Sequence, residues 1–158
     1  MPLFEHAPKT KIAEVFGLAA STLNNWLAER IIVREDDDTD RSTLLRLAVV
    51  CELLAGGWHA RNAARVAQCA AEWARGLDKG DLAPLDTFLF VNAGGVNIDK
   101  AAGLGRLMAK LSQAPGAACI TTLPVGLLLF RVDDVLARLY RGEAVAQPIE
   151  ISPFRVVH

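Results

Sequence analysis

Residues 12–32 read IAEVFGLAASTLNNWLAERII, and this stretch decides the fold. Its first part predicts a helix over 10–16, because the apolar residues there share one face, and Gly17 ends that helix. Its second part predicts another helix over 20–30, because apolar residues recur there at spacings of three and four. These residues are Leu23, Trp26, Leu27 and Ile31. Two short helices that are each apolar on one side cannot be stable alone, so the stretch predicts the start of a helix-turn-helix.

A wing is predicted directly after the second helix. The β-branched run Ile31-Ile32-Val33 suits a short strand, and the polar residues 34–40 suit a loop beside it. A strand and a loop next to two such helices make a winged helix-turn-helix. The loop is strongly acidic, and it holds Glu35, Asp36, Asp37, Asp38 and Asp40. It therefore either points away from DNA or marks a module that binds protein.

Two longer helices are predicted next. Ser42 suits the N-cap of a helix over 43–55, which the pair Gly56-Gly57 ends. A further helix is expected over 60–74, because small and apolar residues recur on one side of it. Residues 76–84 are low in hydrophobicity and contain Gly, Asp, Lys and Pro, so a domain boundary is predicted there.

The second half of the chain predicts a small α/β domain over residues 85–158. The expected elements, in chain order, are a buried strand over 87–91, a turn over 92–97, a helix over 98–112, a strand over 118–123, a third strand or a helix over 127–131, and a helix that Asp133 caps and that runs through Tyr140. The whole sequence thus predicts a mainly α N-terminal winged helix-turn-helix domain, residues 1–76, followed by a small α/β C-terminal domain.

The composition favours a folded protein and excludes nucleic-acid binding by overall charge. Apolar residues make up 52% of the chain, which is enough to build a core. The net charge is −1, so any DNA binding must depend on where charges are placed. Of the eleven acidic residues in 1–80, six lie at position 29 and in 35–40, which leaves five against ten Lys and Arg in that segment. A locally basic face is therefore expected.

The cysteines and the apolar runs point to a reduced, aqueous compartment. The three cysteines are widely spaced and form no Cys-x-x-Cys or Cys/His cluster, which argues against a disulfide framework and against a metal site. No export signal is recognisable, and the longest apolar run, 123–130, is far shorter than the roughly 20 residues needed to cross a bilayer. No catalytic arrangement of Ser, Cys, His and Asp emerges. We expect a cytoplasmic protein that is not an enzyme, needs no cofactor and does not bind membranes.

The N-terminal residues resemble the opening of MerR-type regulators. The family pattern is an Ile-x-Glu-Val helix, a Gly-hydrophobic turn and then Thr-Leu-x-x-Trp followed by an apolar pair, which matches residues 12–32. Arg41, Leu45, Leu47 and the step Gly57-Trp58 continue the pattern, so the likeness covers roughly residues 9–70. The resemblance implies a bacterial or phage transcription regulator that binds double-stranded DNA sequence-specifically.

The second short helix carries the residues expected to read DNA. A helix fits the major groove, and amide side chains such as Asn24 and Asn25 offer a donor and an acceptor that suit adenine. Ser21 and Thr22 lie near the helix start, where backbone N–H groups also favour phosphate. Arginines are expected on phosphates around the wing and the third helix, with Arg61 and Arg65 as further candidates at the fourth. The predicted DNA-binding residues are Ser21, Thr22, Asn24, Asn25, Arg30, Arg34, Arg41 and Arg46.

Departures from the family pattern keep other functions open. The family commonly has Arg at the position of Ser21 and an Arg-aromatic pair in place of Asn24 and Asn25, and its long C-terminal dimerisation helix is absent here. One alternative is a protein–protein interaction module, such as an antirepressor, an antitoxin-like partner or an adaptor. Another is an architectural factor that resembles excisionases and bends DNA. The leading hypothesis includes a homodimer, because two half-sites multiply specificity, with residues 85–158 dimerising, receiving a signal or binding a protein partner.

Overall fold

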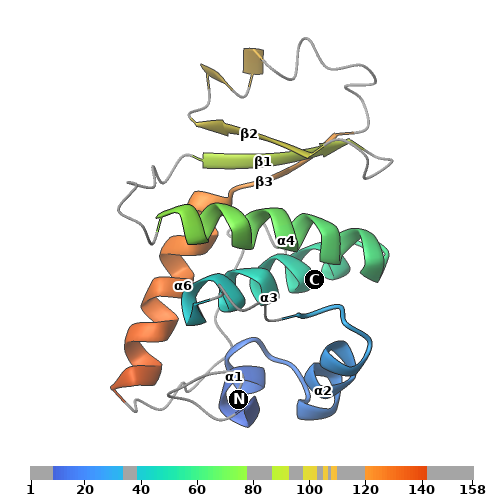
Figure 1. The fold of residues 1–158 in the computed structure, drawn as a ribbon, viewed down its shortest axis with the longest axis vertical. Helices are drawn as coiled ribbons and strands as arrows, with labels where there is room; N and C mark the ends of the chain where they lie inside the picture. The colour runs from blue at the N-terminus through green and yellow to red at the C-terminus, as the bar shows by residue number, and fades with distance from the viewer. Residues whose placement is uncertain are drawn as a thin grey trace.

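Helices dominate the chain, and a small sheet lies between the fourth helix and the last one along the sequence (Figure 1). The computed structural model describes residues 9–33, 39–77, 87–92, 98–102, 105–106, 108–109 and 120–141. The elements are α1 (Lys9–Val15), α2 (Ala20–Ala28), α3 (Asp40–Ala55), α4 (Ala60–Leu77), β1 (Thr87–Asn92), β2 (Ile98–Ala102), β3 (Ile120–Leu123) and α6 (Val125–Tyr140). The protein is thus mainly α, with one small sheet.

The elements form a helical body with the sheet at one end and the two short helices at the other (Figure 1). α3 and α4 pack along each other, and α6 runs along one edge from the sheet towards the end where α1 and α2 lie. The sheet has the order β2-β1-β3, with both pairs antiparallel. β1 is central, and it confirms the strand predicted over 87–91. α1 and α2 are therefore held far from the sheet.

Three helices end in the same way. At the end of α1 the N–H of Leu18 bonds to the carbonyl of Ala13 and the N–H of Gly17 to that of Glu14, which is the Schellman pattern. α2 and α3 end with the equivalent pairs of bonds, around Arg30 and Gly57. The central residue has a positive φ in all three, 66° at Gly17, 57° at Arg30 and 86° at Gly57. The helix ends predicted at Gly17 and at the 56–57 pair are confirmed.

The strand predicted over 31–33 is wrong. These residues form bends and irregular backbone after α2. The N–H groups of Ile31 and Ile32 both bond to the carbonyl of Trp26, at 2.9 and 3.2 Å. Because these two N–H groups are bonded to the end of α2, they cannot pair with a neighbouring strand. Residues 34–38, where the rest of the wing was predicted, lie outside the described residues.

α3 begins three residues earlier than predicted, and its N-cap is Thr39 instead of Ser42. The Thr39 hydroxyl accepts a bond from the Ser42 N–H at 3.2 Å, and the Ser42 hydroxyl accepts one from the Thr39 N–H at 2.9 Å. This is a capping box with Ser at the third helical position. Ser42 does cap the helix, but from inside it.

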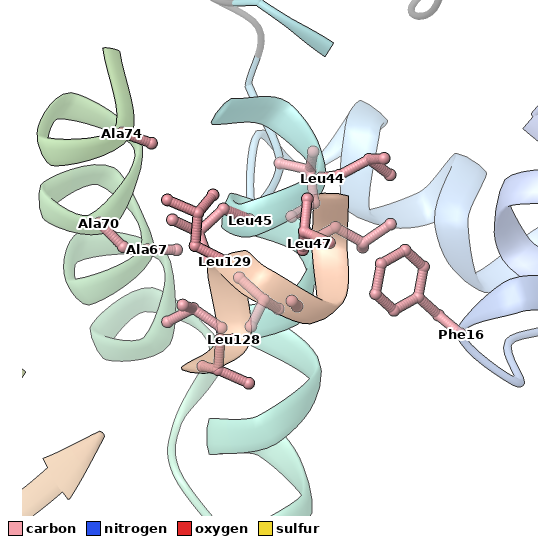
Figure 2. Packing of buried hydrophobic residues seen from close by; sticks show 14 of the residues in the cluster. Phe16, Leu44, Leu45, Leu47, Ala67, Ala70, Ala74, Leu128 and Leu129 are labelled. Atoms are coloured by element: carbon pink, nitrogen blue, oxygen red, sulfur yellow. The ribbon is translucent and has the colours of Figure 1, made fainter. Parts of the chain in front are cut away.

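The core extends across the boundary predicted at 76–84. Leu128 and Leu129 of α6 lie among leucines of α3 and face the alanines of α4, while Phe16 approaches the same cluster from the end of α1 (Figure 2). Leu89 of β1 belongs to the same buried cluster. The two predicted domains, 1–76 and 85–158, stay a prediction, but their described residues share one core. Within the described residues, no helix is both long and apolar enough to span a membrane.

In the second half of the chain, two predictions are wrong, and the structure decides between the strand and the helix considered for residues 127–131. Residues 98–102, predicted as the start of a helix, form β2 and pair with β1. Residues 127–131 are helical, as the alternative had it, because α6 already begins at Val125. Asp133 therefore lies inside α6 and does not cap it. β3 confirms the end of the strand predicted over 118–123, and the turn predicted over 92–97 falls almost wholly outside the described residues.

Candidate nucleic-acid interface

α2 presents an uncharged polar face to solvent. The side chains of Ser21, Asn24 and Asn25 are exposed, and Thr22 is half-buried. On the opposite side Leu23 is fully buried. Nothing charged occurs between Ala19 and Ala28, so the groups that this face offers can form hydrogen bonds but not ion pairs.

The position of α2 follows from how it is anchored. The helix has only nine residues, and Leu23 is its single fully buried side chain. Trp26 and Leu27 are half-buried and pack against the core, so they brace the helix from behind. A helix with one narrow apolar stripe leaves most of its circumference available. The exposed side chains on α2 are therefore held in place by the core without being covered by it.

The start of α2 has no side-chain cap. Ala19 is the N-cap residue, with an extended backbone (φ −68°, ψ 143°) and no side chain that can accept a hydrogen bond. The first backbone N–H groups of a helix lack partners in the turn before them. Here the Thr22 N–H bonds to the Ala19 carbonyl at 3.0 Å, and the alanine cap leaves the N–H groups of Ala20 and Ser21 for water or a ligand. Together with the partial positive charge of a helix start, this favours an anion near Ser21.

Arg30 lies at the other end of α2 and is exposed. Its φ of 57° is in the left-handed region, where the same helix ending elsewhere in this chain uses glycine. A non-glycine residue there carries a conformational cost of roughly 1 kcal/mol. Arg30 thus lies at the surface, directly after α2.

Arg41 is half-buried, and it binds a carboxylate from the second half of the chain. Its Nε lies 2.8 Å from Oδ1 of Asp133, and its Nη2 lies 3.0 Å from Oδ2, so the pair is bidentate. At the residue before Arg41, Oδ2 of Asp40 accepts a hydrogen bond from the hydroxyl of Tyr140 at 3.1 Å. The structure therefore engages Arg41 with α6 and does not leave it on an open arginine surface.

Arg46 is inside the protein, which departs from its predicted place on a DNA-facing surface. Its exposed fraction is 3%, and residues 42–50 of α3 are all buried. The reason is that α4 and α6 both pack on α3 and leave this helix no open side here. A phosphate does not reach the Arg46 guanidinium in this arrangement. Arg34 lies outside the described residues.

The start of α4 adds two exposed arginines. The backbone nitrogen of Arg61 lies 3.4 Å from Nδ1 of His59 and donates to it, so this histidine caps the helix. Arg61 and Arg65 are exposed one turn apart. Farther along the same stripe, Gln68 donates to Glu72 at 3.3 Å. The basic end of this stripe is therefore the one next to the turn between α3 and α4.

The structure brings together four of the eight predicted site residues on one helix and places another at its end. These are Ser21, Thr22, Asn24 and Asn25 on α2, with Arg30 directly after it. The sequence did not predict that Asp133 and Tyr140 bind the side chains of Arg41 and Asp40 at the start of α3. No local signal marks them, because the partners are 92 and 100 residues apart.

The exposed groups of this surface are suited to hydrogen bonding. Its groups are amides, hydroxyls and guanidinium, which donate and accept hydrogen bonds. In the part of the chain that the structure describes, no three potential metal ligands gather at one place. Comparisons of the chain with protein-family models, with curated proteins and with solved structures find no match.

Proposed function

We propose that this protein is a cytoplasmic transcription regulator of the MerR type that binds double-stranded DNA, and that α1 and α2 act as a helix-turn-helix with α2 in the major groove. The observation that carries the proposal is the placement of α2. Its apolar side is anchored by the buried Leu23, while Ser21, Asn24 and Asn25 are exposed on the opposite side. The protein acts by binding and not by catalysis.

The exposed side chains suit this role chemically. An amide can accept from N6 and donate to N7 of adenine, and such a bidentate pair discriminates against a wrong base by about 1–3 kcal/mol. Ser21 at the uncapped helix start and Arg30 at the helix end are placed to meet phosphates on either side of the groove. Asn24 and Asn25 would then specify the sequence, and the flanking groups would fix the register.

The proposal includes a homodimer. One helix of nine residues contacts few base pairs, so specific binding requires a second half-site. The second half of the chain, proposed as residues 85–158, supplies the dimer contact or receives a signal. A wing formed by the polar residues that follow Val33 would add backbone contacts, which makes the module a winged helix-turn-helix.

A protein-interaction module is the second candidate, and the arginines favour it. Arg41 is engaged with Asp133, and Arg46 is 3% exposed, so fewer cations are available than the DNA model expected. With a net charge of −1, the protein has little general attraction to DNA. In this second model the same polar face of α2 docks on another protein.

The experiment is a selection of bound duplexes from random DNA, followed by fluorescence anisotropy titrations over a range of salt. For DNA binding, log K falls linearly with log salt, with a slope of about −0.9 for each phosphate contacted. Replacing Asn24 and Asn25 together by Ala is expected to weaken binding of the selected sequence by about 100-fold, since two amide contacts are lost. Binding to unselected duplexes should change little.

Gln68→Ala is the matched control. It removes an exposed amide from α4, which lies on the other side of α3 from α2 (Figure 1). It should leave both affinities unchanged. If no sequence is enriched, or if the selected duplex binds equally well without both asparagine amides, the DNA-reading role of α2 is wrong. A bend of the duplex on binding, measured by circular-permutation mobility, would assign the protein to the architectural class.

A further inference from the structure

One side of α6 carries exposed or half-buried residues over most of its length. They recur at spacings of three and four, as residues on one side of a helix do. Asp133 and Tyr140 contact side chains of α3, and the buried leucines and valines of α6 lie in the core, so this stripe faces a third direction. We call it the outer stripe of α6, and it consists of Leu127, Phe130, Asp134, Ala137 and Arg138.

Phe130 is the largest apolar side chain of the outer stripe, and 59% of it is exposed. A single exposed apolar residue is ordinary on a protein surface. Here, however, Leu127 lies about one turn before Phe130 and Ala137 lies two turns after it, so the apolar area continues along the stripe. Covering an aromatic ring of this exposure removes a large apolar area from water, which favours association with a partner.

The two charged residues of the outer stripe have opposite signs and lie one turn apart. Within one chain, Nε of Arg138 lies 3.1 Å from Oδ2 of Asp134, and both side chains are about half exposed. A two-fold axis perpendicular to α6 at the level of Leu136 would place Asp134 of each copy opposite Arg138 of the other, because residues equally far from such an axis face each other. A parallel arrangement would instead bring Asp134 beside Asp134. The stripe is therefore complementary to itself when two copies run antiparallel.

We propose that the outer stripe of α6 is the contact through which two copies of this chain form a homodimer, with their α6 helices antiparallel. The proposal rests on the function proposed above in that it names the contact of that homodimer, but it requires no DNA. Phe130 of each copy lies over the last turn of the other copy's α6, and Asp134 pairs with Arg138 twice. Ala137 lies close to the axis, where its small side chain lets the two helices approach. No element has to move, because the stripe is already at the surface.

The length of α6 sets how tight this dimer is. Its 16 residues span about 24 Å. Two such helices alone bury less than the roughly 1,600 Å² of a standard stable interface. The dimer therefore belongs to the weak class, with a Kd in roughly the micromolar range. Its measurement has to cover protein concentrations on both sides of that range.

Sedimentation velocity of the full-length protein over such a concentration series tests the contact. Phe130→Ser should raise the Kd of the dimer about 30-fold, because a central aromatic anchor carries much of the binding energy of an interface. Met108→Ser is the matched control. It removes an apolar side chain that is 60% exposed and lies outside α6, so it should leave the Kd unchanged.

Charge reversal tests whether the pairs form between the copies. Asp134→Arg gives each copy two positive charges in the stripe, and Arg138→Asp gives each copy two negative ones. Either variant alone should raise the Kd about 10-fold, because like charges then face each other. An equal mixture of the two variants should associate within about threefold of the wild type, since every pair between the copies is again of opposite sign. A pair that acts only within one helix cannot produce this recovery, because neither variant chain contains it.

Further variants separate a specific contact from general attraction between chains of opposite charge. When both chains of the mixture also carry Phe130→Ser, the recovery should disappear. A recovery that persists would show that the charges attract without the stripe, and it would overturn the proposal. Circular dichroism checks that each variant is folded, and the charge variants, which change only exposed side chains, decide the question should Phe130→Ser fail to fold.

The remaining outcomes distinguish this proposal from the function on which it rests. A wild type that stays monomeric overturns the proposal and leaves the stripe to a different protein, and a dimer that no stripe variant weakens places the contact elsewhere. If such a protein still binds a selected duplex through Asn24 and Asn25, its DNA-reading role stands. If the stripe variants weaken the dimer as expected but no duplex is enriched, the contact stands and the DNA-binding function is wrong.

Discussion

Two pairs of helices in this chain are joined by the same turn, and they differ in what the second helix buries. In the α1–α2 pair and in the α3–α4 pair, the first helix ends in Schellman bonds around a glycine of positive φ, Gly17 or Gly57. The second helix begins three residues after that glycine, at Ala20 or Ala60. The two turns are therefore equivalent in their backbone.

The second helices have opposite roles. α2 has nine residues and buries only Leu23 completely, whereas α4 has 18 residues and buries a row of small side chains against α3. These buried residues are Ala63, Val66, Ala67, Ala70, Ala71 and Ala74. The comparison shows that the turn sets where the second helix starts, whereas the size of its apolar residues sets how much of that helix is buried. The small residues of α4 allow it to pack closely on α3. In α2 a single leucine is buried, and the polar side of the helix stays exposed to solvent.

The largest effect is expected when the single anchor of α2 is removed. Leu23→Ala should lower the free energy of unfolding by about 3 kcal/mol, because a fully buried leucine leaves a cavity. Denaturant titration measures this loss. Native-state hydrogen exchange should show that the amides of α2 lose more protection than those of α4. Equal losses in both helices would break the comparison, since α2 would then be part of the same cooperative unit as α4.

The second prediction concerns the close packing of α4. Ala67→Leu should destabilise the protein by about 2 kcal/mol, because Ala67 is fully buried facing α3 and α6 and has no room for three more carbons (Figure 2). Gln68→Leu is the control, since it adds a leucine to the exposed side of the same helix. Thermal unfolding compares the two. A tolerated leucine at position 67 would show that residue size does not set the distance between α3 and α4.

The local features of both pairs were predictable from sequence, and the non-local ones were not. Glycines at 17 and 57 mark helix ends because the bonds there join only residues within five positions of one another. The strand at 98–102 was missed because nothing in IDKAA marks a strand; its conformation comes from pairing with β1. The run at 127–131 was undecided because a short apolar segment suits a strand or a buried helix equally well.

In the candidate site, too, the local features were predictable and the non-local ones were not. The exposed side of α2 follows from helical periodicity, so Ser21, Asn24 and Asn25 lie where the sequence placed them. The arginines of α3 do not lie on the surface where the sequence placed them, because α6, which comes some 80 residues later, packs around them. Periodicity gives a helix one buried side, but it cannot say how many neighbours will cover that helix. Arg46 is buried for this reason.

The third prediction supplies the cap that α2 lacks. Ala19→Ser should stabilise the protein by about 1 kcal/mol, because the Ala19 backbone is already extended and a serine hydroxyl can accept from the first turn. For a chain of this length, that corresponds to a rise in the melting temperature of about 3 °C. Ala20→Ser, one residue inside the helix, is the control and should not stabilise. If neither serine raises the melting temperature, the donors at the start of α2 are already satisfied, and the proposed phosphate contact there loses its basis.

The smallest effect on stability is expected at Arg30, where α2 differs from the helices that end in glycine. Arg30→Gly should stabilise the protein by about 0.5 kcal/mol, since the relief of a positive φ outweighs the extra freedom of glycine in the unfolded chain. Arg30→Ala removes the same side chain but keeps a Cβ in the left-handed region, so it should not stabilise. Both variants should weaken binding to the selected duplex alike if the guanidinium meets a phosphate. A glycine variant that gains stability and loses no affinity would mean that the arginine is not retained there for DNA contact, and the end of α2 would then be removed from the proposed interface.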